Sequence, residues 1–299
     1  MPLSPRFKAY TAFAAVCFFW GTTYLTIRMS LEAFPPLIVV GARFTLAGLI
    51  TLAGARLARA RLPRGRELWQ CIVNGMLILG VGNGALVYSE VWVPSGMAAL
   101  MLTISPFWMV GLDAFVFKGT KLHLMTVVGM LVGLSGVLLL IGPDALDVRT
   151  GASMVAGFLV LQAGSVCWNV GSPLQRRQPT PVHPIVSAGV QQLAVGMAAL
   201  AVAAIVPGQV VHWSARGAGA LLYVVVFGSL VGYSAYLYAL DSLPVPVLSL
   251  YTYVNPVVAV ILGWIFYREP FTLSDALAVP LIFSGIAIVR RSQQAASTS

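Results

Sequence analysis

Long apolar stretches follow one another along this sequence almost without interruption, and each is about as long as a membrane-crossing helix. Such a helix needs about 20 mostly apolar residues, because the hydrocarbon core is about 30 Å thick. The connections between the stretches are short and carry Pro, Gly and charge. We therefore expect an all-α integral membrane protein with ten transmembrane helices at 9–29, 36–56, 68–88, 95–116, 123–142, 152–173, 184–206, 217–240, 245–266 and 273–290.

The composition agrees with a surface that faces lipid. Hydrophobic residues make up 59% of the 299 residues and charged residues only 9%, whereas about a quarter of the residues in a soluble domain are charged. The formal net charge of +9 could indicate nucleic-acid binding, but the basic residues lie in short runs between apolar stretches. This distribution favours a role in membrane orientation, so we expect a lipid bilayer as partner and no nucleic acid.

The basic residues also orient the predicted spans. With a cytoplasmic N-terminus, the inside carries 13 Lys and Arg residues: Arg6, Lys8, Arg56, Arg59, Arg61, Arg64, Arg66, Lys118, Lys121, Arg176, Arg177, Arg290 and Arg291. The outside then carries only Arg28, Arg149, Arg216 and Arg268. Because cytoplasmic loops are enriched in Lys and Arg, we expect both termini in the cytoplasm. The first stretch runs past Met29 without an A-x-A site, which indicates a retained helix rather than a signal peptide.

The sequence also contains an internal repeat with a spacing of 150 residues. Six residues recur at this offset: Gly82, Ala85, Tyr88, Pro94, Leu100 and Pro106 match Gly232, Ala235, Tyr238, Pro244, Leu250 and Pro256. Trp20 and Trp168 extend the match to the start of each half. Five spans in each half is an odd number, so the second half must enter the membrane in the opposite sense. We predict two inverted five-helix repeats at 1–146 and 147–291, followed by a disordered cytoplasmic tail at 292–299.

Several short motifs resemble those of a known family. Phe19-Trp20-Gly21-Thr22-Thr23-Tyr24 resembles a first-helix W-G signature, and Pro35-Pro36 with Gly41-Ala42-Arg43-Phe44 resembles a P-P…R-F entry into helix two. Tyr238-Ala239-Leu240, Tyr253-Val254-Asn255-Pro256-Val257-Val258-Ala259 and Arg268-Glu269-Pro270 resemble a Y-A-L…P-V-x-A…G-E-P pattern. In order and spacing, the chain resembles the EamA-type ten-helix members of the drug/metabolite transporter superfamily. The family usually has a second acid after helix four, where this chain has Lys118-Gly119-Thr120-Lys121.

This resemblance implies a secondary transporter that moves small metabolites across the bacterial inner membrane by alternating access. The many aromatic residues inside the spans are similar to those of YddG-type amino acid exporters, which implies export of aromatic or other neutral amino acids. A different small solute (a drug, a nucleoside or a sugar-like metabolite) is the alternative. The sequence has no G-x-x-x-x-G-K-[ST] loop, so we expect no ATPase partner and no cofactor.

The candidate substrate-binding residues are aromatic and amide side chains of the predicted spans: Trp20, Tyr24, Asn83, Tyr88, Trp108, Trp168, Asn169, Tyr238 and Tyr251. Both tryptophans of the repeat lie well inside their spans, where lining a cavity and packing in a core are equally consistent with the sequence. Tyr88 and Tyr238 lie near span ends, where anchoring at the membrane surface is favoured. Asn83 and Asn169 are the preferred amides, although hydrogen bonding between helices is the more frequent role of a single membrane amide.

Pro106 and Pro256 occupy matching positions inside spans four and nine. Proline removes a backbone donor and clashes with the preceding helical turn, so each should kink or loosen its helix. Because the prolines recur in both halves, we expect paired hinges or gates, with a static packing kink as the alternative.

Arg43 and Asp113 are the clearest charges inside predicted spans. Charge at this depth is costly, so each side chain should face the protein interior. Their depths differ by roughly 16 Å at the rise of an α-helix, which argues against a direct pair. We expect Asp113 near the cytoplasmic face, and either a functional role for Arg43 or the capping of a neighbouring helix end.

Titratable groups are scarce in the predicted spans. Span one has no Asp or Glu, whereas Glu90 and Asp241 lie at span ends, where solvated acids are the rule. The three histidines lie at span boundaries, and the three cysteines form no C-x-x-C pair. We therefore expect no metal site and no enzymatic activity. We therefore expect no strong proton carrier, and both uniport and proton coupling stay open.

Overall fold

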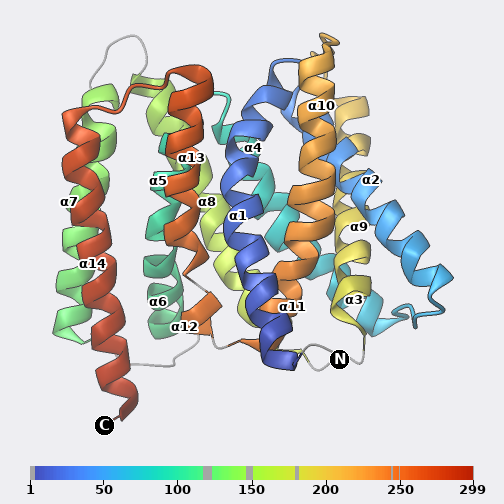
Figure 1. Cartoon of the computed structure of the whole chain (residues 1–299), viewed down its shortest axis with the longest axis horizontal. Helices are drawn as coiled ribbons and strands as arrows, with labels where there is room; N and C mark the ends of the chain where they lie inside the picture. The colour runs from blue at the N-terminus through green and yellow to red at the C-terminus, as the bar shows by residue number, and fades with distance from the viewer. Residues whose placement is uncertain are drawn as a thin grey trace.

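The computed structural model describes residues 4–116, 123–145, 151–178, 182–243, 245–248 and 250–298. Within these ranges every regular element is a helix, and the long helices stand side by side in one bundle (Figure 1). The start of α1 and the end of α14 lie at the same end of the bundle, where α12 also lies (Figure 1). The prediction of an all-α fold is confirmed over the described residues.

The helices of the first half follow the predicted spans closely. They are α1 (Pro5–Leu31), α2 (Pro36–Leu57), α3 (Arg66–Gly75), η1 (Met76–Asn83), α4 (Gly84–Ser89), α5 (Ser95–Met101), η2 (Leu102–Ile104), α6 (Ser105–Phe115) and α7 (Leu124–Ala145). Proline occupies the first turn of α1 and α2, where its missing N–H has no helical acceptor and its fixed φ suits a helix start.

The second half repeats this order. Its helices are α8 (Gly151–Arg177), α9 (Pro184–Ile205), α10 (Ala215–Tyr223), η3 (Val224–Tyr233), α11 (Ser234–Ser242), α12 (Val245–Leu248), α13 (Tyr251–Tyr267) and α14 (Leu273–Thr298). Residues 292–298 continue α14, which differs from the predicted disordered tail. The reason is composition, because Gln293, Gln294, Ala295 and Ala296 all favour a helix.

Seven helical stretches in the described part of the chain are long and apolar enough to cross a membrane. Three shorter apolar helices of 10–17 residues accompany them, at Leu124–Leu140, Tyr251–Tyr267 and Leu273–Val289. The membrane class follows from these stretches, whereas the count of ten spans and the cytoplasmic position of both termini stay predictions.

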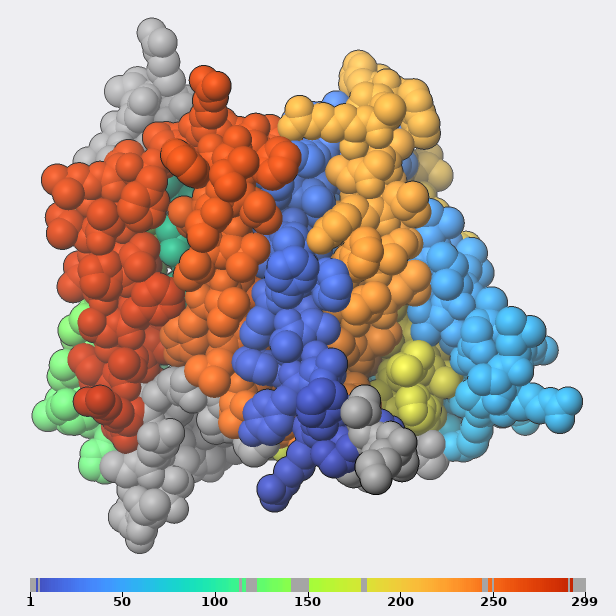
Figure 2. Space-filling model, in the orientation of Figure 1, coloured from blue at the N-terminus to red at the C-terminus, as the bar shows by residue number. Residues whose placement is uncertain are grey.

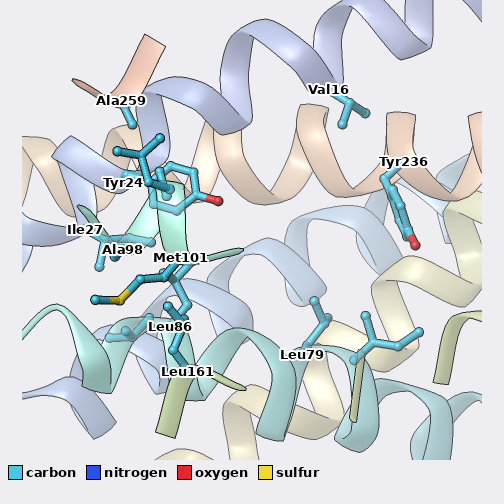
Figure 3. Close-up of a cluster of buried hydrophobic side chains, with 14 of the residues drawn as sticks. Val16, Tyr24, Ile27, Leu79, Leu86, Ala98, Met101, Leu161, Tyr236 and Ala259 are labelled. Carbon is cyan, nitrogen blue, oxygen red and sulfur yellow. The ribbon is translucent and has the colours of Figure 1, made fainter. Parts of the chain in front are cut away.

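The two halves are interleaved rather than set beside each other. The first helix of the first half, α1, packs against α13, η3, α10 and α11 of the second half, and α8 packs against η1, α4 and α6 of the first half. Figure 2 shows α1 in dark blue wedged between the orange helices of the second half. Their buried apolar side chains form one core between the halves, which includes Tyr24, Leu86, Met101, Leu161 and Tyr236 (Figure 3).

One local feature occurs in both halves and was not expected from the sequence. Met76–Asn83 (η1) and Val224–Tyr233 (η3) are π-helical segments, and they end 150 residues apart at Asn83 and Tyr233. A π-helical turn is wider than an α-helical turn and disturbs the regular backbone pairing, and it often occurs at functional sites. Both segments lie against the first helix of the other half.

Candidate functional site

A cavity of about 80 Å³ lies in the middle of the bundle, between helices of both halves. Its lining residues are Trp20, Thr23, Tyr24, Arg43, Gly82, Asn83, Leu86, Ala99, Leu102, Ser105, Gly164, Ser165, Trp168, Tyr251, Thr252 and Asn255. A larger cavity of about 350 Å³ shares Ser105, Trp168, Tyr251 and Thr252 with it. The larger cavity reaches Leu248 of α12, so it extends toward the end of the bundle where α1 starts.

Four aromatic rings from α1, α8, α11 and α13 form the wall between the two cavities. The ring centroid of Trp20 lies 5.6 Å from that of Trp168, 5.0 Å from Tyr236 and 5.4 Å from Tyr251. Trp20 meets Trp168 and Tyr251 edge to face, whereas its ring is tilted by 30° to that of Tyr236. Contacts at these separations fix the rings relative to one another, and they leave apolar faces and edges for a solute. We call Trp20, Trp168, Tyr236 and Tyr251 the aromatic cluster.

Each tryptophan of the cluster packs on a glycine of the other half. A Cβ at Gly232 would lie 2.5 Å from the indole nitrogen of Trp20, and one at Gly82 would lie 3.2 Å from a ring carbon of Trp168. The indole N–H of Trp20 donates to the carbonyl oxygen of Gly228 at 3.0 Å, within the π-helical segment η3. The repeated glycines and wide turns therefore make room for the repeated tryptophans.

We expect the substitution Gly232→Ala to lower both stability and transport. The added methyl group must displace Trp20, and overpacking of this kind costs about 1–3 kcal/mol of unfolding free energy. Thermal unfolding in detergent measures the first effect, and solute flux in liposomes measures the second. Gly219→Ala is the matched control, because nothing lies within 4 Å of its added Cβ. Equal behaviour of the two variants would contradict the packing role of Gly232.

Among the residues that the structure describes, Arg43 is the only charged side chain that lines the central cavity, and it is 3% exposed. Its Nε donates to Ser229 Oγ at 2.7 Å and one terminal nitrogen donates to Asn83 Oδ1 at 3.0 Å, while its guanidinium lies 4.7 Å from the ring centroid of Phe44. Among the described residues, no Asp or Glu oxygen lies within 4.0 Å of it. The cavity thus contains a cation held by neutral groups.

The structure brings most of the predicted site residues to the two cavities. Trp20, Tyr24, Asn83, Trp168, Tyr251 and Arg43 line the central one, and Asn169 and Pro106 line the larger one. Asn169 also bonds Ser105 Oγ at 2.7 Å and the carbonyl of Ser165, so both predicted amides link helices as well as face a cavity.

Four predicted residues lie elsewhere. Tyr88, Trp108, Tyr238 and Pro256 line neither cavity, and Trp108 is 38% exposed with its indole N–H bonded to Gln162. The backbone of Asp113 belongs to α6, but its side chain and residues 117–122 lie outside the described part of the chain.

The two prolines differ in their surroundings. Pro106 follows the 3₁₀ turn η2, which interrupts the helical span between α5 and α6, whereas α13 continues as an α-helix through Pro256. In the second half, α12 ends at Leu248 and α13 starts at Tyr251, and residue 249 between them lies outside the described part of the chain. Their hinge role stays a prediction.

Several polar lining residues were missed by the sequence analysis. Thr23, Ser105, Ser165 and Thr252 all line the central cavity, and the buried hydroxyl of Ser165 has no hydrogen-bond partner among the described residues. Thr23 and Ser165 lie three residues from Trp20 and Trp168. Helical spacing from the two tryptophans was therefore a usable signal, since residues three apart share a helix face.

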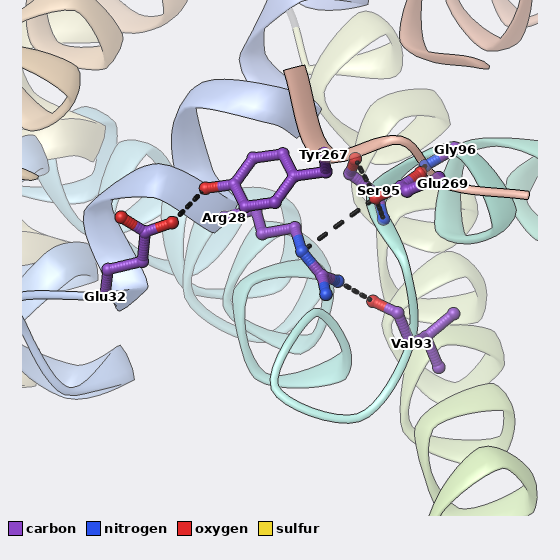
Figure 4. A network of polar contacts seen from close by, with 7 residues as sticks. All are labelled: Arg28, Glu32, Val93, Ser95, Gly96, Tyr267 and Glu269. Carbon is purple, nitrogen blue, oxygen red and sulfur yellow. Dashed lines mark hydrogen bonds and ion pairs between the residues drawn. The ribbon is translucent and has the colours of Figure 1, made fainter. Parts of the chain in front are cut away.

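A polar network closes the opposite end of the bundle. Glu269 accepts from the backbone N–H groups of Ser95 and Gly96 at 3.1 and 3.0 Å, and from Ser95 Oγ at 2.9 Å. Arg28 lies 3.9 Å from the same carboxylate and donates to the Val93 carbonyl (Figure 4). We call Arg28, Val93, Ser95, Gly96 and Glu269 the clasp, because they join α1, the start of α5 and the end of α13.

An interleaved membrane bundle with a central cavity, closed at one end and extended toward the other, is typical of membrane transporters. The EamA-like transporter family model matches residues 7–142 and again residues 155–291. The chain belongs to the EamA-like transporter family, which confirms the family predicted from the motifs.

Relatives cover nearly the whole chain. "Uncharacterized inner membrane transporter YedA" of Escherichia coli K12 is 32% identical over 286 residues, which is 94% of this chain and 90% of that protein. "Protein PecM" of Dickeya dadantii is 27% identical over 93% of this chain and 91% of that protein. A solved crystal structure shares the fold, with a TM-score of 0.67 at 22% identity over 94% of this chain and 96% of that one. The chain is a multi-pass membrane protein, and the predicted bacterial inner membrane agrees with the name of the first relative.

Proposed function

We propose that the protein is a secondary transporter that exports small carboxylate-bearing solutes, foremost aromatic and other neutral amino acids, by alternating access. The observation that carries this proposal is Arg43, a buried guanidinium that lines an aromatic-walled cavity without an acidic partner among the described residues. A buried cation favours an anionic group that completes its hydrogen bonds. A solute carboxylate is such a group.

The other lining residues suit the rest of an amino acid. Ser229 and Asn83 accept from two of the five N–H groups of the guanidinium, which leaves donors for a carboxylate. The aromatic cluster offers ring faces to an ammonium group or to an apolar side chain. This combination favours a YddG-like specificity for amino acids with apolar or aromatic side chains.

The two ends of the bundle support alternating access. The clasp closes one end, and the larger cavity extends toward the end at which α1 starts. With both termini in the cytoplasm, as the basic residues predict, the protein faces inward and its closed end faces the outside. Opening of the clasp would then release an internal solute to the outside, and the inverted repeats would exchange conformations around the fixed site.

The test is counterflow of labelled phenylalanine in liposomes that contain the purified protein. We expect Trp20→Ala and Trp168→Ala each to reduce counterflow by about tenfold or more, because each removes several ring contacts of about 1 kcal/mol. Expression and thermal unfolding are followed in parallel, so that a folding defect is not mistaken for loss of transport.

Trp264→Ala is the matched control, since this tryptophan of α13 is 63% exposed and lines neither cavity. Normal counterflow in both cluster variants would remove the aromatic cluster from the pathway. Absence of counterflow for every amino acid with the wild-type protein would refute the proposed substrate class.

A further inference from the structure

Glu90 is a buried acid that none of the functions above uses. It follows directly after α4, is 3% exposed, and neither carboxylate oxygen has a hydrogen-bond partner among the described residues. The expectation of a solvated acid at a span end is therefore wrong for Glu90, although Asp241 of the second half is exposed as expected. The physical reason is tertiary, because the closed end of the bundle covers this span end.

An ionised carboxylate in this position would be costly. Burial without hydrogen bonds disfavours the charged form, and a buried acid then either pairs with a cation or takes up a proton. Among the described residues, no Lys, Arg or His nitrogen lies within 4.0 Å of Glu90. The surroundings therefore suit a group that changes its protonation state.

The position of Glu90 connects the cavity and the clasp. Leu86, one helical turn before it, lines the central cavity. The charged groups that act on its carboxylate are Arg28 on α1, Arg43 on α2 and Glu269 after α13, and the charge of Glu90 in turn acts on the hydroxyl of Tyr24 on α1. The neighbouring α5 has no charged residue, and α8 carries charge only at its far end, at Arg176 and Arg177. Glu90 thus faces the cation of the proposed solute site and both charges of the clasp.

We infer that Glu90 is a proton-binding site that couples solute movement to proton movement. The inference rests on the proposed function for the identity of the coupled solute. Proton binding by Glu90 does not depend on the proposed function. When the clasp is open, a carboxylate oxygen of Glu90 takes a proton from a hydronium ion on that side, and the side chain changes from an anion to a neutral acid. One O–H bond forms at Glu90, one O–H bond of the hydronium ion breaks, and a water molecule is left.

Arg43 and Arg28 are near Glu90 and also belong to the proposed solute site and to the clasp, and they determine whether proton and solute move in the same or in opposite directions. An anionic Glu90 offsets the charge of Arg43 and competes with Glu269 for Arg28, whereas a neutral Glu90 does neither. Proton binding at Glu90 therefore favours carboxylate binding at Arg43 and a closed clasp, and by linkage a bound carboxylate favours the proton. Solute and proton then move across the membrane in the same direction. During export, a high internal concentration of the solute drives both of them outward.

The first test needs no solute. Infrared difference spectra of the reconstituted protein are recorded across a pH titration, and the carbonyl stretch of a protonated carboxylic acid is followed. We expect a titrating band in the wild type and in Asp241→Asn, and its loss in Glu90→Gln, which keeps the size of the side chain. A band that persists unchanged in Glu90→Gln, or no titrating band in the wild type, would overturn the proton site.

The second test measures coupling. Liposomes with the wild-type protein or with Asp241→Asn should accumulate labelled phenylalanine up to about tenfold under a gradient of one pH unit, since one coupled proton carries that driving force. Glu90→Gln should show no accumulation. Equal accumulation by Glu90→Gln would refute the coupling. Failure of counterflow in the wild type would refute the proposed solute class instead, and the infrared titration would still decide the role of Glu90.

Discussion

The substitution Arg43→Gln is expected to reduce counterflow by about 100-fold while the protein stays folded. Two charge-assisted hydrogen bonds to a carboxylate contribute about 3 kcal/mol in total, and each 1.4 kcal/mol is a factor of about ten in affinity. The glutamine amide can still donate to Ser229 or Asn83, and removal of a buried charge relieves a desolvation penalty. Counterflow in liposomes measures the loss of transport, and thermal unfolding in detergent measures whether the protein stays folded.

Two further variants make the result specific. Arg56→Gln removes an exposed arginine from the same helix and should leave flux unchanged. Arg43→Lys keeps the charge but loses the planar pair of donors, so it should fall between the wild type and Arg43→Gln. If Arg43→Gln transports as well as the wild type, the guanidinium does not anchor the solute.

The second large effect is expected at the clasp. Glu269→Gln removes the negative charge that accepts from two backbone N–H groups and from Ser95, so the closed end should open more often. Loss of charge-assisted bonds of this strength shifts a two-state equilibrium by more than about tenfold. The readout is the rate at which a membrane-impermeant maleimide labels Ala99→Cys, introduced into the central cavity of a protein whose three cysteines have been replaced.

Labelling from the outside should be slow with Glu269 present and faster in Glu269→Gln. Glu67→Gln serves as the control, since the Glu67 ion pair with Arg61 lies near the surface and such pairs contribute little. Unchanged labelling in Glu269→Gln would show that the clasp does not keep this end of the bundle closed.

The helices could be predicted well from the sequence because each span carries its own signal. Prolines in the first turn of α1, α2 and α9 mark where these helices begin. The length of each apolar stretch indicates a membrane span without any information about tertiary packing. The π-helical segments could not be predicted in this way. Met76–Asn83 and Val224–Tyr233 are apolar runs like their neighbours, and what distinguishes η3 is the indole of Trp20 that bonds Gly228 from another helix.

The site could be predicted only in part, for a related reason. Trp20, Trp168 and Arg43 reach the cavity, whereas Trp108 and Tyr238, with the same side-chain chemistry, do not. A membrane helix is apolar on nearly all faces, so its sequence does not reveal which face is turned inward. Glu90 shows the limit most clearly, because it lies at a span end where a solvated acid is expected, and only the packing of the whole bundle reduces its exposure to 3%.

The matched π-helical segments also bear on the ancestry of the chain. A π-helical turn arises when one extra residue is accommodated in an α-helix, and such an insertion is costly enough to be rare. Independent insertions at the same repeat position in two halves would be a double coincidence. The simplest history is that a common ancestor of the two halves already contained the extra residue before its gene was duplicated. Each half would then have kept the wide turn against which the tryptophan of the other half packs.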